Sequence, residues 1–268
     1  MKKKILFVLL LFCTLLTISC KKDVLNLNQN VQNKITGYFD FKDHLNNDGS
    51  IGITSYKAAF GEDVNGVYQI NGALKDIDGN SLKLSKLIVD NVTIEPTVNG
   101  RFNTPVSLME QIKSFYGKEI ILKSYKENND LSIRSGDIVL DASLKMSKDI
   151  QVSSPTIKDN GKFIKRSQLV TWNADFNNTR KVIIAILFDP THGLNKNFNS
   201  NKPNATYLEV DDTGQYQLTP NNFKNIPNGA LISIFVARGN YTKVTGANGK
   251  SQYTIYGYSI AEQKFYIE

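Results

Sequence analysis

Few residues of this chain have the types and spacing that catalysis requires. Its two histidines, His44 and His192, both lie among turn-forming residues, so we expect solvated loop histidines and not catalytic bases. The sequence contains neither a Gly-x-Ser-x-Gly nucleophile elbow nor a His-Glu-x-x-His zinc motif. No catalytic residue, metal site or cofactor site is therefore predicted, and a hydrolase is the least favoured of three functions.

Clustered carboxylates give only a weak indication of calcium. Residues 76–80 (Asp-Ile-Asp-Gly-Asn) and 46–49 (Asn-Asn-Asp-Gly) are similar to fragments of calcium-binding loops. An EF-hand loop also needs an acidic first ligand and a glutamate at position twelve, and counting from Leu74 that position is Ser85. Hairpin turns are the favoured interpretation of both segments. The pair Asp211-Asp212 stays as an alternative weak calcium site in a loop between strands.

Aromatic side chains could form a platform for a sugar ring. The candidates are Trp172, Tyr207, Tyr241, Tyr253 and Tyr266. Because Trp172 lies in an apolar extended run, we expect it in the core. Tyr241 and Tyr253 flank the glycine-rich segment 245–249, and this position favours exposure and ligand contact.

The first twenty residues are typical of an export signal. Met1 is followed by three lysines, and residues 5–18 are mostly apolar, which matches the charged and apolar regions of a secretory signal. As a helix, this apolar run would span roughly 21 Å, which is less than the hydrocarbon core of about 30 Å. We therefore predict a signal peptide over residues 1–19 and not a membrane-spanning helix.

The signal ends in Thr17-Ile18-Ser19-Cys20. This segment resembles the lipobox of bacterial lipoproteins, in which a small residue precedes a cysteine that is acylated and becomes the new N-terminus. It departs from that pattern because Thr17 stands where leucine is usual. Thr17 and Ser19 also satisfy the rule for ordinary signal cleavage, so a soluble secreted protein is the alternative. The resemblance implies lipid attachment at Cys20 and, since each buried CH₂ contributes about 0.8 kcal/mol, a stable anchor of two or three acyl chains.

The charge and cysteine content of the chain limit the classes of partner that it can bind. Removing the signal lowers the basic residues from 32 to 29 against 25 acidic ones, so the net charge falls to +4. Basic residues form no clustered stripe, so no nucleic-acid partner is expected. The only other cysteine, Cys13, lies within the signal, which leaves the mature chain without a thiol for a disulfide or a metal.

The abundance of Asn and Lys resembles envelope lipoproteins of the Bacteroidetes, especially the flavobacterial group, and implies an outer-membrane location. Lys21-Lys22-Asp23 contains a single acid, so both the surface and the periplasmic face stay open.

The mature chain is expected to be mainly β, in two tandem β-sandwich domains. Residues 20–33 are a polar tether, 34–150 a β-rich domain, 151–164 a linker and 165–268 a second domain. Asn-Gly and Asp-Gly pairs indicate tight hairpins in the first domain. A helix is predicted at about 104–116, with Thr104 as N-cap and Pro105 as the first helical residue. Strands are expected at 67–70, 82–89, 92–94, 119–125, 137–144, 168–172, 182–188, 207–210, 215–218, 231–237, 252–260 and 265–267.

In the second domain, Thr219-Pro220 should start a short helical link, and Tyr256, Tyr258 and Ile260 share one face of a strand, consistent with inward packing. Val170-Thr171-Trp172 and the segment 214–219 resemble the strands of fibronectin type III and immunoglobulin-like domains. Those folds carry many unrelated functions. The leading function is therefore a non-enzymatic, lipid-anchored envelope protein that binds or displays through loops of its sandwiches, to a glycan or a protein. The alternative is a surface glycan-binding lipoprotein that serves polysaccharide uptake, similar to starch-binding lipoproteins with tandem immunoglobulin-like modules.

Overall fold

The computed structural model describes residues 49–60, 63–127, 137–157, 161–193 and 204–268. Across these segments the chain is mainly β with one short α-helix, as the sequence predicts. The predicted signal, tether, Cys20 and His44 lie outside the described residues, and nothing of the His192 side chain is described.

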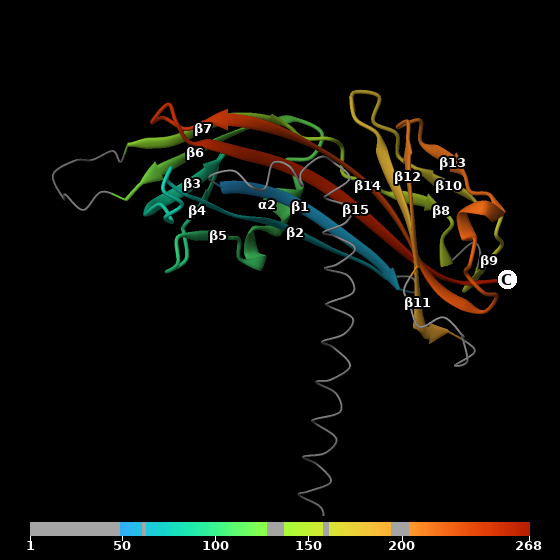
Figure 1. The fold of residues 1–268 in the computed structure, drawn as a ribbon. Coiled ribbons are helices and arrows are strands. Elements are labelled where there is room, and N and C mark those ends of the chain that lie inside the picture. The colour runs from blue at the N-terminus through green and yellow to red at the C-terminus, as the bar shows by residue number, and fades with distance from the viewer. Residues whose placement is uncertain (1–48, 61–62, 128–136, 158–160, 194–203) are drawn as a thin grey trace, which may run out of the picture. The chain divides into compact units, whose positions relative to one another are not determined.

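A long central sheet extends through the described part of the chain (Figure 1). Its strand order is β12-β11-β14-β15-β1-β2-β5, and β9 also pairs with β15. β15 pairs in parallel with β1 and with β9, and the other neighbours are antiparallel. The bounds are β1 Gly49–Phe60, β2 Asp63–Leu74, β5 Arg101–Asn103, β9 Phe163–Ile164, β11 Val182–Gly193, β12 Asn204–Val210, β14 Ala230–Thr245 and β15 Gln252–Ile267.

Two smaller antiparallel sheets cover one face of the central sheet. The first has the order β4-β3-β6-β7 and the second β13-β10-β8. Their bounds are β3 Leu84–Val89, β4 Val92–Ile94, β6 Glu119–Lys126, β7 Ile138–Lys145, β8 Val152–Ser154, β10 Leu169–Trp172 and β13 Gln215–Gln217. β8 and β9 lie within the segment that the sequence indicates as a linker.

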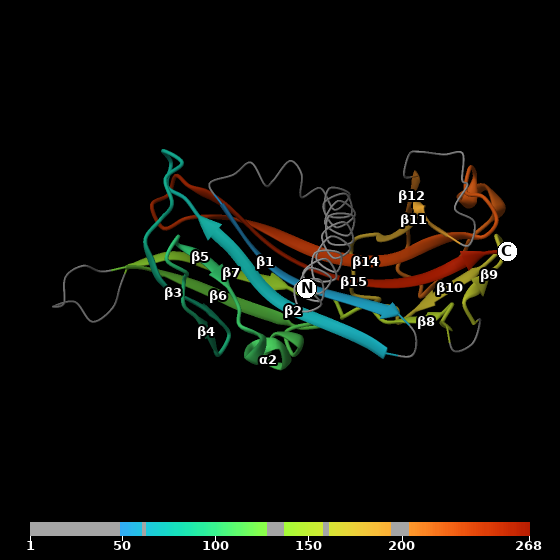
Figure 2. The same cartoon turned by 90° about the horizontal axis from the view of Figure 1, so that it is seen from below.

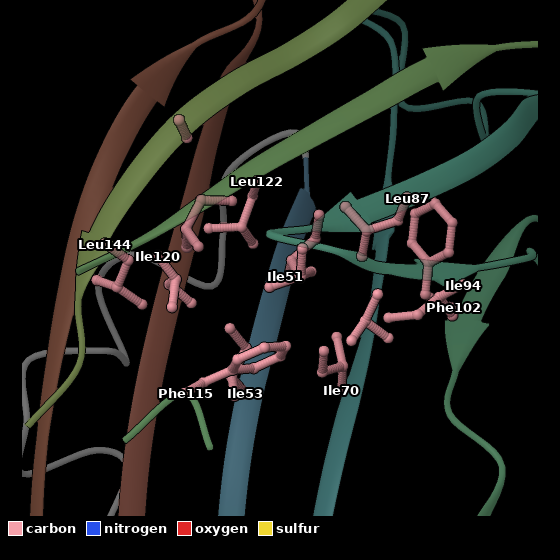
Figure 3. Close-up of a cluster of buried hydrophobic side chains, with 14 of the residues drawn as sticks. Ile51, Ile53, Ile70, Leu87, Ile94, Phe102, Phe115, Ile120, Leu122 and Leu144 are labelled. Carbon is pink, nitrogen blue, oxygen red and sulfur yellow. The ribbon is translucent and has the colours of Figure 1, made fainter. Parts of the chain in front are cut away.

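Each covering sheet encloses its own hydrophobic core. In the first core, Ile51 and Ile70 from the central sheet point toward Leu87 and Leu122 from the covering sheet (Figure 3). The second core lies between β11 and β14 on one side and β10 on the other, and it includes Trp172, which is 4% exposed. The expectation that Trp172 is a core residue is thus confirmed. Burying these apolar surfaces is the main source of stability for each half.

β14 and β15 belong to both halves. Each strand has 16 residues, and the two run side by side past β7 and on toward β9 (Figure 2). Along β15, Tyr253 and Ile255 enter the first core, whereas Phe265 and Ile267 enter the second. The two cores are therefore joined through continuous strands.

The helical segment is shorter than the predicted 104–116. It consists of a 3-10 turn, η1 (Val106–Leu108), followed by α2 (Met109–Lys113). Thr104 is not its N-cap, because its hydroxyl accepts the backbone N–H of Ile70 on β2 at 2.9 Å. The link at 219–223 agrees with prediction: η2 (Pro220–Phe223) has a capping box formed by Thr219 and Asn222.

Tyr256 and Tyr258 do not pack inward. Side chains alternate along a strand, and the inward positions of β15 include Tyr253 and Ile255. The rings of Tyr256 and Tyr258 therefore lie on the opposite face, stacked at 6.0 Å with an interplanar angle of 4°. The predicted central strand at 182–188 is confirmed, since all of these residues are buried.

Candidate functional site

A band of polar side chains crosses the central sheet between the two cores. We call this band the polar seam: Ser55 and Lys57 on β1, Arg238 on β14 and Ser259 on β15, all buried. On β1 the inward positions change from isoleucine to serine and lysine as the strand leaves the first core. Buried polar groups of this kind need hydrogen-bond partners, and the covering segments supply them.

The chain crosses the seam in a single extended step after β7. Met146 belongs to the first core and Ile150 to the second, so residues 147–149 lie over the seam. The backbone there is tightly held: the N–H of Lys148 donates to Asp175 at 2.8 Å, and the N–H of Ile150 donates to the hydroxyl of Ser259 at 2.9 Å. This anchoring fixes the position of Asp149.

Asp149 is the centre of the seam. Its carboxylate accepts hydrogen bonds from Ser55 at 2.9 Å, Ser259 at 2.6 Å and Tyr68 at 2.7 Å. Lys57 completes the cluster with an ion pair at 2.5 Å. Four donors from three strands, β1, β2 and β15, thus converge on one carboxylate.

The electrostatics favour the charged form of Asp149. Burial alone would raise the pKa of this carboxyl, but the hydrogen bonds from Lys57, Ser259 and Tyr68 outweigh it and hold the pKa below its usual value. Burial lowers the pKa of Lys57, although Asp149 opposes this shift. Lys57 also donates to the carbonyl of Ile150 at 2.6 Å. Because these groups satisfy one another, the cluster forms an ionic floor held by Lys57 and Asp149.

A half-open cleft of about 510 Å³ lies above this floor, and its volume is in the range of small-ligand sites. Its lining comes from α2, from β8 and the residue before it, and from β1, β2 and β15 of the central sheet. The residues that line it are Lys57, Gly66, Tyr68, Glu110, Lys113, Gln151, Val152, Ala261, Glu262 and Gln263.

A second polar cluster closes the seam on the side of β14. The guanidinium of Arg238, which has no exposed surface, pairs with Asp212 at 2.8 Å and also donates to Asn173. The indole N–H of Trp172 donates to the same Asp212 carboxylate at 2.8 Å, and Asn178 adds a third donor at 3.0 Å. These contacts tie the loops of the second half to the central sheet.

The aromatic residues predicted for ligand contact lie away from the cleft. Tyr253 is 1% exposed, contrary to the expected exposure, because its ring fills the first core and its hydroxyl donates to the carbonyl of Lys75 at 3.1 Å. Tyr241 is half-buried, and the guanidinium of Arg180 lies 4.0 Å from its ring centre. The structure does not bring these two residues together with Lys57 or Asp149.

The carboxylate clusters also have structural partners. Asp76 accepts the backbone N–H groups of Asp78 at 3.0 Å and Asn80 at 2.8 Å, which is the expected tight turn. Asp211 pairs with Lys181, whereas Asp212 is bound by Arg238. Among the described residues, no group of three or more His, Cys, Asp or Glu side chains is placed to hold a metal ion.

Sequence reasoning missed the residues of the cleft. Asp149 fell beside a predicted linker, and Lys57 fell in a stretch where no strand was predicted. The available signal was the pattern of β1, where Ser55 and Lys57 occupy inward positions after Ile51 and Ile53. A lysine in that register has to be paired, but its partner is 92 residues further along the chain and no local pattern identifies it.

Membrane and family comparisons add no further assignment. Within the described segments, no helix has both the length and the apolar character needed to span a bilayer. The chain matches no protein-family model, and a search of curated proteins finds no significant match either.

Proposed function

We propose that this chain is a non-enzymatic, lipid-anchored protein of the cell envelope that binds a small ligand in the cleft beside the polar seam. The observation that carries the binding part is the cleft itself, about 510 Å³ in volume, above a floor fixed by Lys57 and Asp149. Preorganised polar groups of this kind favour binding because little ordering remains to be done. Since the floor residues satisfy each other, they support binding more than acid–base chemistry.

The anchor is proposed from the sequence. Cys20 follows a signal-like segment, and the resemblance to a lipobox supports acylation at that cysteine and retention at the outer membrane, on either of its faces. The two smaller sheets that cover the central sheet support a β-sandwich architecture whose halves share β14 and β15, and the cleft lies at the junction of these halves and not at the loops.

Lipid attachment is tested by metabolic labelling with a palmitate analogue. The wild-type protein should carry the label, and Cys20→Ala should abolish it because no other thiol remains in the mature chain. Cys13→Ala is the matched control: its cysteine lies within the signal, so the label should persist. Label that survives Cys20→Ala would refute the anchor.

Ligand binding is tested by a thermal-shift screen of the full chain with sugars, amino acids, nucleosides and organic acids. A Cβ added at Gly66 would meet Tyr68 Cε2 at 3.2 Å and Lys57 Cγ at 3.5 Å, so Gly66→Leu places a side chain in the cleft. Compounds that raise the melting temperature of wild type should have no effect on Gly66→Leu. A ligand that stabilises both proteins equally binds elsewhere and contradicts the proposed site.

Glycan capture for polysaccharide uptake is the second candidate. It is favoured by Gln151 and Gln263, two amide side chains that line the cleft.

A further inference from the structure

Charges at the cleft are balanced. Each of the two lysines that line it faces a carboxylate: Lys57 and Asp149 are 2.5 Å apart, and Lys113 and Glu110 are 3.5 Å apart. A charged ligand would lose hydration on entering the cleft without meeting an uncompensated opposite charge. The cleft therefore favours an uncharged ligand.

Gln263 places a primary amide at the cleft. It is 7% exposed, it lines the cleft, and no described residue forms a hydrogen bond with its amide. On β15 it lies two residues beyond Ala261, whose register partner on β1 is Lys57, so all three side chains face the same side of the sheet. A primary amide offers two donors and an acceptor, and because the amide of Gln263 opens onto the cleft, all of them are available to a ligand.

Lys57 has a donor left over beside this amide. Its ammonium group has three N–H bonds, of which Asp149 and the carbonyl of Ile150 take two. The ring of Tyr68 lies against the same space, with the ammonium group of Lys113 6.0 Å from its centre. The base of the cleft thus offers donors, one acceptor and an aromatic ring, without net charge.

From this balance we infer that the cleft binds a neutral polyhydroxylated ligand of the saccharide class, with Gln263 as the residue that selects it. Adjacent hydroxyls of such a ligand each donate and accept, so they can satisfy both ends of the amide while a further hydroxyl accepts from Lys57. An acidic saccharide would lose the hydration of its carboxylate without meeting an unpaired cation, because Lys57 and Lys113 are already paired, and it is disfavoured. The inference rests on the proposed ligand-binding function and specifies its substrate class.

The test is a binding titration of the full-length chain in detergent micelles. The probes are neutral oligosaccharides of glucose, mannose and xylose, and oligomers of glucuronic and galacturonic acid. At least one neutral probe should bind, and Gln263→Met, which keeps the side-chain length and removes the amide, should weaken that binding about tenfold. Gln252→Met changes the same residue type at an exposed end of the same strand and should leave the affinity unchanged.

Folding of the variants is checked by the fluorescence of Trp172 before titration. If Gln263→Met unfolds, Gln263→Glu keeps the shape, removes the two N–H donors and adds charge, and it should also weaken neutral binding. Equal binding by wild type and a folded Gln263 variant overturns the inference, as does tighter binding of the acidic oligomers. If no saccharide binds, the substrate class is overturned, whereas the palmitate label and the broader thermal-shift screen decide the proposed function separately.

Discussion

Lys57 and Asp149 form an ion pair whose side chains are only 10% and 14% exposed. Removing two charges from water costs several kcal/mol per ion, and the attraction between them offsets this cost only when further hydrogen bonds complete the shell. Ser55, Ser259 and Tyr68 complete the shell of the carboxylate here. The pair therefore fixes a geometry more than it adds stability, but losing one member is costly.

Asp149→Asn should destabilise the protein by about 3 kcal/mol, because it leaves the Lys57 ammonium group buried without a counter-charge. The free energy of unfolding from urea titration measures this change. Asp141→Asn is the control: its pair with Lys123 is 54% and 40% exposed, so the loss should stay below about 1 kcal/mol. Equal losses from the two variants would show that the seam pair is not critical.

Lowering the pH should remove the difference in the free energy of unfolding between Asp149→Asn and wild type. Because the folded-state pKa of Asp149 lies below the ordinary value of 3.8, the ionised carboxylate contributes stability above that pH. This contribution disappears as the pH falls through the lowered pKa. Urea unfolding of both proteins from neutral pH downward should give curves that converge below pH 3.8. If the difference in unfolding free energy between the two proteins does not change with pH, the effect of the variant comes from packing and not from the charge.

At the scale of elements, two glycines on the strands that flank β15 each face a tyrosine of β15. Gly52 on β1 is paired with Tyr256, and Gly239 on β14 with Tyr258. A Cβ at Gly52 would meet the far end of the Tyr256 ring at 2.4 Å, and a ring can rotate away. A Cβ at Gly239 would lie 2.7 Å from the carbonyl oxygen of Gly257, which is backbone and cannot move alone. The close approach of β14 to β15 thus depends on Gly239.

Gly239→Ala should therefore cost about 1–3 kcal/mol, in the range of overpacked positions. Gly52→Ala should cost less, and Lys243→Ala, at an exposed position of the same β14, should stay within about 0.5 kcal/mol. Thermal unfolding of the three variants gives the ranking. A Gly239→Ala protein as stable as Lys243→Ala would contradict the tight packing of these strands.

At the scale of the whole molecule, the two cores share β14 and β15. A break between the halves would have to cut both 16-residue strands and the ladder between β1 and β15, and it would expose the buried ionic groups of the seam. Independent domains usually meet at linkers that few contacts cross. The described segments between residues 49 and 268 should therefore unfold as one cooperative unit.

The single tryptophan makes this testable, because Trp172 lies in the second core. Leu87→Ala removes a fully buried side chain from the first core and should cost about 2–5 kcal/mol. If the protein is one cooperative unit, Leu87→Ala lowers the urea midpoint by the same amount whether unfolding is followed by Trp172 fluorescence or by circular dichroism. Ile121→Ala, at a position that is 52% exposed, should leave both midpoints unchanged. If Leu87→Ala leaves the urea midpoint of Trp172 fluorescence unchanged, the two halves unfold as independent domains.

Local patterns in the sequence determined much of the secondary structure. Alternating apolar residues located most strands, the capping residues Thr219 and Pro220 marked the short link, and the apolar run around Trp172 placed it in the core. These features depend on residues within a few positions of one another, which is the range over which periodicity and capping act. The expected lipid anchor at Cys20 is likewise a local pattern, and it stays a prediction.

Tertiary structure alone decided the seam and the cleft. Asp149 lies 94 residues from Ser55 and 110 from Ser259, and the three meet because β1 pairs in parallel with β15 and residues 147–149 cross over both. The sequence pattern does not predict β1, because the inward face of this strand is apolar only at Ile51 and Ile53. Which strand pairs with which is set by packing between distant segments, and an inward polar residue does not reveal its partner. The sequence could therefore exclude familiar catalytic motifs, but it could not locate the ligand site.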